Sequence, residues 1–479
     1  MRTLPKALLD LDIIVGGMGA DISSVELVGA VASHPCGRMS GSLSAVALAD
    51  IYARRLQLGD VGGEIRRAFD AFVKVVPTLT KDIDRLYKTY YIQGGKSASA
   101  LFRGLSMKGL EPPRDVQILT IAATFSHIWR TKRLAPGRPV GINFLRKIER
   151  VMVYGLYGAM LAGADWIVVG AGDPSDIPGL LDKLAAHEAV ELPMQVATVP
   201  LGTYKIRFDP KDIVGPDLPP PPRPAFLAII SSHLQAQGLA SSPRTRPEGF
   251  VVEGPLAGGH NAPPQKKMKD ARGYYVYGPE DDADLGVVAE VGLPFWVAGG
   301  RGQPLKPSTA EGPLRGRQIG TIFALSDASG MAPALRRQAL ELIWHQQLEV
   351  VTDVRASPST FPFKVALLPG SMADPAVYAA RKRVCNVGQL RSWRPMEEMT
   401  GLCPASDPAL YKKRGGAAWR TDGAMCLCNG LLATCGLPQP GEQGLVTLGD
   451  ITPVRELQRR LRKIEYSTQE AIAYLRGEL

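Results

Sequence analysis

The feature that most constrains the fold is a series of eight short apolar runs rich in β-branched residues, most of which end at or near glycine. They cover residues 13–16, 37–41, 140–144, 166–170, 226–231, 250–254, 295–299 and 317–321. Segments of helical pattern lie between most of them, for example residues 25–33, 154–164 and 177–187. Strands that alternate with helices form parallel sheets, and eight such strands close a barrel. We therefore predict an α/β fold, a TIM (β/α)8 barrel.

Two regions depart from this alternation of strands and helices. About a hundred residues separate the second and third runs, far more than one βα unit needs, and helical patterns at 45–58, 65–75 and 118–133 predict a helical insertion over about 43–138. Residues 216–224 hold four consecutive prolines and predict a stiff connector. After residue 350 the alternation stops. We therefore expect a barrel domain over 1–350 and an appended loop-rich region over 351–479, which ends in a helical pattern at 454–476.

Charge and hydropathy exclude some classes of function. The chain has 56 Lys and Arg against 46 Asp and Glu, a formal charge of +10. No long basic run is interleaved with aromatic residues, so nucleic-acid binding is not expected, whereas an acidic partner or an anionic ligand suits the charge. Asp10 and Asp12 interrupt the N-terminal apolar run, and glycines and Asp165 interrupt residues 153–172. We expect neither a signal peptide nor a membrane span, and hence a cytoplasmic protein.

Residues that follow the strands of a βα barrel form its active face. Here they include many glycines, which let a ligand approach the backbone closely. Glycine pairs after the seventh and eighth strands are typical of a phosphate site. Together with the backbone after strand one and with Asn143 after strand three, they suit a flavin mononucleotide (FMN) that lies across the barrel mouth. The expected binding residues are Gly17, Met18, Gly19, Asn143, Glu253, Gly258, Gly259, Gly299, Gly300, Gln318, Gly320 and Thr321.

His260 is the best catalytic candidate. It follows two glycines at the end of the sixth run, where backbone and cofactor should lie close together. An imidazole there titrates near neutral pH and can take a proton from an acidic carbon or return one. His233, at the end of the fifth run, is a second candidate.

The same motifs resemble those of a known family. Residues 16–19 with Ile22 and Ser23, 141–143, 159–165, 170–172, 253–254 with 257–260, 298–300 and 318–321 are similar to the nitronate monooxygenase (2-nitropropane dioxygenase-like) flavoproteins, which are FMN-dependent TIM barrels. Ala257–Gly258–Gly259–His260 is the most specific match. The resemblance implies that His260 is the acid/base beside the flavin, and that Asn143, Gly258, Gly299 and residues 318–321 hold FMN.

The C-terminal region resembles a longer branch of the same family, on residues such as Cys403–Pro404 and 426–429. A related branch comprises stand-alone enoyl reductases of polyketide and polyunsaturated fatty acid assembly lines. The chain departs from the family pattern at Arg38 and Arg301, which place positive charge at the active face and favour an anionic substrate or an acidic carrier.

Three functions follow from these observations. The first is an FMN-dependent oxidoreductase of the nitronate monooxygenase type, which oxidises a small carbon acid. The second is an enoyl reductase that acts on thioesters bound to acyl carrier protein. The third is a flavin-binding scaffold without catalysis. The expected partner is thus a small-molecule substrate or an acyl carrier protein, and a homodimer is compatible with the sequence.

The cysteines leave two interpretations open. Cys385, Cys403, Cys426 and Cys428 could supply four thiolates to zinc or to an iron–sulfur cluster. Their spacing is irregular and contains no CxxC pair, so reduced structural thiols are the preferred interpretation. We include no metal in the predicted site.

Overall fold

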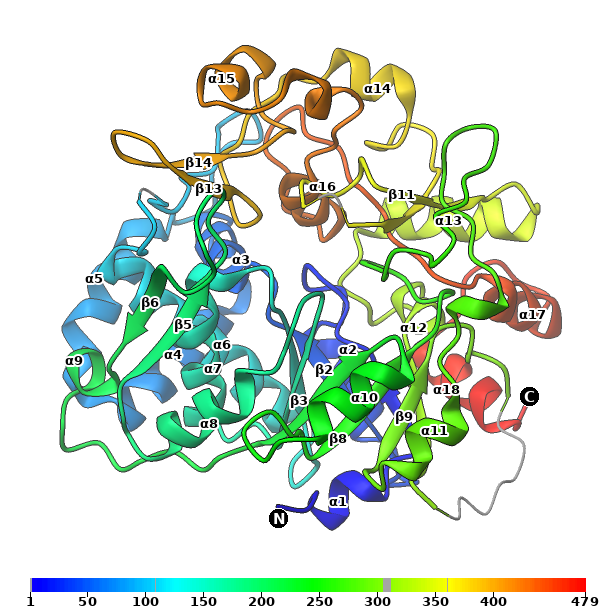
Figure 1. Cartoon of the computed structure of the whole chain (residues 1–479), viewed down its shortest axis with the longest axis horizontal. Coiled ribbons are helices and arrows are strands. Elements are labelled where there is room, and N and C mark those ends of the chain that lie inside the picture. Colours follow the sequence, from blue (N-terminus) through cyan, green and yellow to red (C-terminus); the bar gives the residue numbers. More distant parts are fainter. Residues whose placement is uncertain (1, 108, 305–311, 360) are drawn as a thin grey trace.

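The computed structural model describes residues 2–107, 109–304, 312–359 and 361–479. In this part of the chain, eight parallel strands close into a barrel in the order β1-β10-β9-β8-β7-β4-β3-β2. The strands are β1 (Ile13–Val15), β2 (Met39–Ser44), β3 (Gly141–Leu145), β4 (Trp166–Gly170), β7 (Ala225–Ile230), β8 (Gly249–Glu253), β9 (Phe295–Ala298) and β10 (Leu314–Ile319). Helices flank them (Figure 1). The predicted TIM barrel is confirmed, and each predicted run overlaps one of its strands.

Two strands lie a few residues away from their predicted bounds. The run predicted at 37–41 is the strand Met39–Ser44, and the run predicted at 317–321 is Leu314–Ile319. The sequence of β2 is polar because its serines form hydrogen bonds with buried polar partners. Ser40 donates to the carbonyl of Pro139, and the indole of Trp166 donates to Ser42 Oγ at 3.0 Å. Hydrogen bonds inside the fold therefore replace the apolar alternation that marks a half-buried strand.

Large side chains fill the interior of the barrel. Trp166 and Trp296 are fully buried there, and the indole of Trp296 donates to the carbonyl of Leu11 at 2.8 Å. The chain around the short helix α1 (Lys6–Leu9) contributes Leu4 and Leu8 to the same cluster. It thereby closes the end of the barrel opposite the C-terminal region (Figure 1). The interior is packed, so a ligand site must lie at a mouth of the barrel.

The predicted insertion contains α3 (Leu48–Gln57), α4 (Glu64–Val75), α5 (Thr80–Tyr90) and α6 (Arg114–Leu134), with the short turns η1 (Val61–Gly63) and η2 (Pro77–Leu79). α5, which is not among the predicted helices, is an amphipathic helix that buries Ile83, Leu86 and Tyr90 along one face. Around the barrel lie α2 (Val25–Ala32), α7 (Glu149–Leu161), α8 (Ile177–Ala185), α9 (Pro210–Val214), α10 (His233–Ala240), η3 (Pro279–Asp281), α11 (Leu285–Glu290), α12 (Thr321–Ala324) and α13 (Pro333–Trp344).

An unpredicted antiparallel hairpin of β5 (Val190–Met194) and β6 (Tyr204–Phe208) packs beside α7. Residues 216–224, the proline-rich connector, form no helix or strand before β7.

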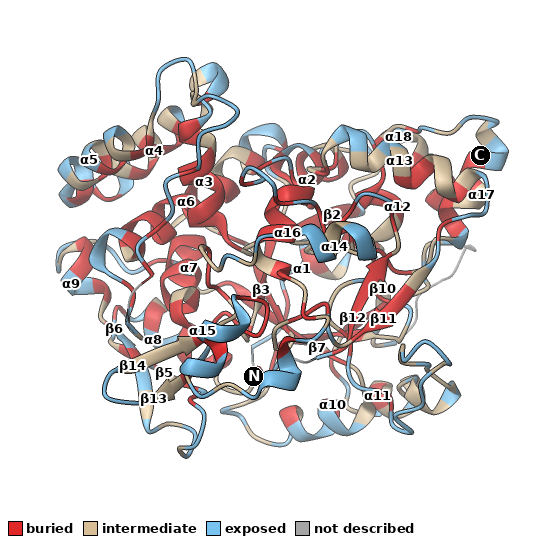
Figure 2. Cartoon of the chain, turned by 90° about the horizontal axis from the view of Figure 1, so that it is seen from above, coloured by how far each residue is buried: buried red, intermediate tan, exposed pale blue. Residues whose placement is uncertain are grey.

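Residues 351–479 lie across the carboxyl ends of the barrel strands and along one side (Figure 1). They contain most of β11 (Val350–Asp353), then β12 (Phe363–Ala366), α14 (Pro375–Ala380), β13 (Ser392–Pro395), β14 (Met399–Leu402), α15 (Pro408–Lys413), η4 (Ala418–Thr421), α16 (Leu427–Thr434), α17 (Thr452–Leu461) and α18 (Thr468–Arg476). Figure 2 shows exposed residues on α14 and α15 and buried ones along the barrel, α6 and α7.

The single helical pattern predicted over 454–476 is two helices. Arg462 takes a left-handed conformation (φ 55°) at the end of α17, and Ser467 caps α18 in a capping box with Glu470. The apolar periodicity continues across the break, which is why the pattern did not reveal it. None of the helices in the described ranges is both long enough and apolar enough to cross a membrane.

Candidate functional site

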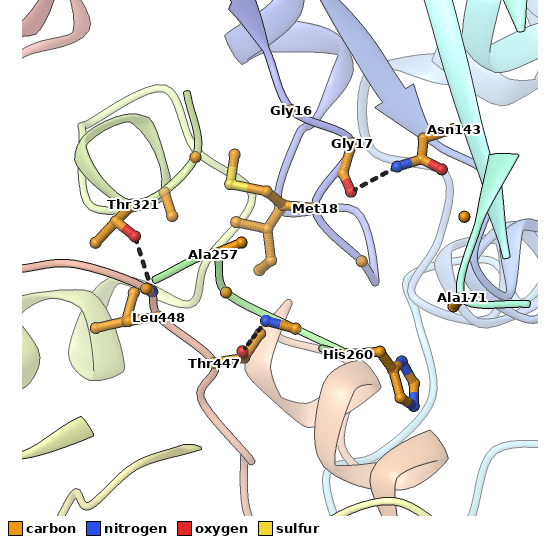
Figure 3. A pocket seen from close by; sticks show the side chains of 18 of the residues that line it. Gly16, Gly17, Met18, Asn143, Ala171, Ala257, His260, Thr321, Thr447 and Leu448 are labelled. Carbon is orange, nitrogen blue, oxygen red and sulfur yellow. Dashed lines mark hydrogen bonds between the residues drawn. The ribbon is translucent and has the colours of Figure 1, made fainter. Parts of the chain in front are cut away.

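A large pocket opens at the carboxyl ends of the barrel strands. Its empty volume, which includes the open mouth, is about 1620 Å³. Every predicted site residue lines it: Gly17, Met18, Gly19, Asn143, Glu253, Gly258, Gly259, His260, Gly299, Gly300, Gln318, Gly320 and Thr321. Figure 3 shows how the labelled members of this set surround one space.

One wall is the backbone that follows β1, held against Asn143 at the end of β3. Asn143 Nδ2 donates to the carbonyl of Gly17 at 3.4 Å (Figure 3). A Cβ atom at position 17 would lie 2.2 Å from the Cβ of Asn143, so only glycine fits. The N–H of Met18 donates to Ser23 Oγ at 2.9 Å, which fixes the turn after Gly17. The backbone at Gly17 is therefore held in place and carries no side chain.

Two amide side chains in the pocket have buried oxygens without a partner. Asn143 is 7% exposed and Gln318 is 8% exposed. Neither Asn143 Oδ1 nor Gln318 Oε1 has a hydrogen-bond partner within the described ranges. A buried unpaired carbonyl oxygen costs about 1–3 kcal/mol, so two of them in one pocket indicate polar groups that a ligand would satisfy.

A second polar region lies after β9 and β10. Gly299 and Gly300 have positive φ angles of 79° and 67°, which favour glycine. A Cβ atom at Gly299 would lie 2.7 Å from the carbonyl oxygen of Gly254. Among the hydrogen bonds of the described residues, none uses the backbone N–H of Gly299, Gly300 or Gly320. Arg301 lines the pocket beside them. Free N–H groups with a guanidinium form an environment suited to an anion.

The C-terminal region supplies a further wall that the sequence did not predict. Thr447 Oγ1 accepts from the N–H of Gly259 at 2.8 Å, and the N–H of Gly449 donates to Thr321 Oγ1 at 2.9 Å (Figure 3). Val387, Gln389, Leu390, Leu427, Leu431 and Leu448 also line the pocket. These residues follow no barrel strand, so the strand-end rule could not find them. The N–H of Gly259 is therefore engaged, whereas Thr321 Oγ1 accepts from Gly449 and keeps its own O–H to donate to a ligand.

His260 stands at one side of the pocket (Figure 3). Its Nε2 lies 2.8 Å from Ser357 Oγ, which in turn lies 2.7 Å from Ser359 Oγ. Its ring packs edge-on against Phe363 with centroids 4.9 Å apart. Burial lowers the pKa of His260 well below its usual range, and the positive charge of Lys147 lowers it further. The imidazole is therefore neutral at pH 7 and available as a base.

Glu253, the last residue of β8, faces the same pocket. Burial raises the pKa of this carboxyl to about 8. It is therefore mostly protonated at pH 7 and can donate a hydrogen bond or a proton. The pocket thus combines a neutral base with a neutral acid, an arrangement in which the environments of two titratable groups push their pKa values in opposite directions.

His233, the second histidine candidate, is not among the residues that line the pocket. It is the first residue of α10, and its Nδ1 accepts from the N–H of Asp284 at 3.4 Å. It begins a helix on the outside of the barrel.

The six cysteines, all of them within the described ranges, are free thiols. Those ranges hold no group of three or more His, Cys, Asp or Glu side chains arranged to bind a metal ion. Cys385, Cys403, Cys426 and Cys428 nevertheless line one small cavity.

No protein-family model and no curated protein matches the sequence. Among solved structures, the chain is similar to the enoyl reductase domain of MlnA from the macrolactin biosynthesis cluster of Bacillus amyloliquefaciens, with 9% identity and a TM-score of 0.47. The match covers 100% of this chain and 99% of that one. A likeness of this strength carries no argument about function.

Proposed function

We propose that the protein is an FMN-dependent oxidoreductase of the nitronate monooxygenase type, which oxidises a small carbon acid with His260 as the base. The observation that carries the proposal is the neutral imidazole in a pocket that the predicted cofactor residues line. A base that is already deprotonated at pH 7 suits removal of a proton from an acidic carbon.

The residues present fit FMN. The backbone at Gly17, which carries no side chain, would let a planar ring system approach closely, and the unpaired oxygens of Asn143 and Gln318 could accept hydrogen bonds from it. The free N–H groups of Gly299, Gly300 and Gly320, with Arg301, would hold the phosphate. When bound, FMN would supply the redox chemistry of the oxidation, with dioxygen as the final electron acceptor.

The role of the protein is then to orient the substrate and move the proton. Nε2 of His260 is hydrogen-bonded to Ser357 Oγ, so we assign Nδ1 as the basic nitrogen. Nδ1 takes the proton from the carbon, and the imidazolium holds that proton while the substrate is oxidised. The apolar side chains Leu390, Leu427 and Leu431 exclude water from this reaction.

The first test is the visible spectrum of the purified protein and the identity of any released flavin. With FMN bound, rapid oxygen consumption on addition of a nitronate supports the proposal, and oxygen-insensitive reduction by NAD(P)H contradicts it. His260→Ala should keep FMN and lose about 10²–10⁴-fold in turnover of a neutral nitroalkane, from which the proton must be removed; this is the usual value of a general base. His233→Ala is the matched control, because His233 lies outside the pocket, and it should keep full activity.

A second function rests on the protonated Glu253. An enoyl reductase must deliver a proton to carbon after hydride transfer, and a carboxyl with a pKa of about 8 is a suitable donor. The charge of +10 suits docking of an acidic acyl carrier protein. Turnover that requires NAD(P)H and a carrier-bound enoyl thioester, and that fails on free nitronates, would favour this function. Full biological activity of His260→Ala would favour the non-catalytic scaffold instead.

A further inference from the structure

A group of cysteines lies in the C-terminal region, outside the site described above. Cys403 and Cys426 are buried beside Ala405 and Ala424, and Cys385 packs on this small cluster. With Cys428 they line a cavity with an empty volume of about 240 Å³. Three separate segments bring them together: the loop after α14, the end of β14 and the start of α16.

Cys385 has an environment unlike that of its neighbours. Arg391 Nε donates to Cys385 Sγ at 3.3 Å, and Arg391 Nη2 donates to the carbonyl of Cys385 at 2.7 Å. Gly388 makes this contact possible, because it turns the chain with a φ of 70° and a Cβ atom there would lie 2.8 Å from Arg391 Cζ. The thiol is half-buried, so a small molecule can reach it.

Cys403 is the partner of Cys385 within this group. The neighbouring Cys403 thiol is the largest cause of a lowered pKa at Cys385, about 6, and the positive charge of Arg391 lowers that pKa further. The neighbouring Cys385 and burial raise the pKa of Cys403 well above its usual range. Cys385 is therefore the sulfur that loses its proton first, and Cys403, packed in the same cluster, keeps its proton.

From this geometry we propose that Cys385 and Cys403 form a redox-active dithiol that a peroxide oxidises to a disulfide. The Cys385 thiolate attacks one oxygen of the peroxide, an S–O bond forms, the O–O bond breaks and an alkoxide or hydroxide leaves. Cys385 is then a sulfenic acid, oxidised by two electrons, and the peroxide is reduced. Cys403 attacks the Cys385 sulfur, the S–S bond forms, and hydroxide leaves as water with the Cys403 proton.

The dithiol is connected to the main pocket. Val387, Leu390 and Cys428 line both cavities. Pro358, which lines the cysteine cavity, directly follows Ser357, the hydrogen-bond partner of His260. A disulfide at Cys385 would therefore form two residues away from Val387, which lies in the wall that the two cavities share. The proposal does not depend on the reaction assigned to the main pocket.

The test is a thiol titration and a peptide map of the full-length protein before and after treatment with hydrogen peroxide. Free thiols should fall by two, a single disulfide should join the peptides of Cys385 and Cys403, and dithiothreitol should restore both thiols. Cys36→Ser is the matched control, since Cys36 lies outside the cavity, and it should still lose two thiols. Arg391→Leu should slow the loss several-fold, because the thiolate loses its positive neighbour.

Several results would overturn the proposal. In Cys403→Ser, Cys385 should stop at the sulfenic acid, which a dimedone probe detects; loss of two thiols in this variant contradicts the pairing. Thiols that stay reduced in the wild type, or a disulfide that joins other cysteines, contradict it as well. So does elemental analysis that finds zinc or iron bound in equal amount to the protein and lost with the cysteines.

Discussion

At the scale of single residues, the catalytic candidate His260 is hydrogen-bonded to a residue that lies outside the barrel strands. Ser357, 97 positions away in sequence, is hydrogen-bonded to Nε2 of His260 and so orients the ring and leaves Nδ1 without this bond. We predict that Ser357→Ala lowers kcat roughly 10-fold, well short of the loss in His260→Ala, because the base remains but its tautomer and orientation are no longer fixed. Steady-state rates with a neutral nitroalkane measure this effect.

Ser357 would be a positioning residue, so its test needs a readout that simple destabilisation would not move. The flavin content and melting temperature of Ser357→Ala should match the wild type, and Ser357→Thr, which keeps the hydroxyl, should restore kcat. An equal loss in the threonine variant would show that the site responds to packing and not to the hydrogen bond.

Glu253 is a second residue of the pocket, and the burial of its carboxyl lowers the stability of the folded protein. Its pKa is about 8 in the folded protein and about 4.5 when the chain is unfolded. Between these values the unfolded state gains a charge that the folded state lacks, so stability falls as pH rises from about 4.5 to 8. Glu253→Gln removes this penalty. We predict that it raises the free energy of unfolding at pH 7 by up to about 3 kcal/mol, with no gain at pH 4.

Denaturant unfolding at the two pH values measures the difference. A gain that is the same at pH 4 and pH 7 would mean that the carboxyl does not titrate as described. If the substitution also weakens flavin or substrate binding, the stability cost of Glu253 is explained by its function at the pocket.

At the scale of elements, the β1 turn is the most constrained part of the site. In Gly17→Ala the added carbon meets Asn143, at the end of β3, at 2.2 Å. We predict that this substitution abolishes FMN binding and lowers the melting temperature by several degrees, because either the turn or β3 must move. Gly179→Ala is the control: it lies in α8 with nothing within 4 Å, so it should retain both properties. Absorbance at 450 nm against protein concentration gives the flavin content.

The elements also differ in how far their sequences predict them. Apolar strands such as β4 and β8 are evident from their residues alone, and the glycines that follow them correctly indicate where the pocket lies. The predicted bounds of β2 differ from the observed ones because its serines bond inside the fold. The sequence predicts one helix over α17 and α18 because the apolar pattern continues across the left-handed residue at the end of α17. Thr447 and Ser357 could not be predicted, because their roles depend on where a distant loop packs.

At the scale of the whole molecule, the C-terminal region shares a core with the barrel. One continuous apolar cluster runs from β1 through α16 to α18. Buried polar contacts cross the same boundary: Tyr466 Oη donates to the carbonyl of Ile322 at 2.8 Å, and Thr468 Oγ1 lies 2.9 Å from Ser326 Oγ. A boundary near residue 350 separates two patterns in the sequence, while in space the second region completes the pocket of the first.

This shared core has a consequence for unfolding. We predict one cooperative transition, in which tryptophan fluorescence, far-UV circular dichroism and flavin release coincide, because neither region keeps its apolar cluster without the other. Tyr466→Phe leaves the buried carbonyl of Ile322 without its donor. It should lower the free energy of unfolding by about 1–3 kcal/mol, and all three signals should report the same decrease. Tyr204→Phe, on the peripheral hairpin, should leave them unchanged. If only flavin release shifted in Tyr466→Phe, the C-terminal region would unfold by itself, and the pocket would be an interface between two independent domains.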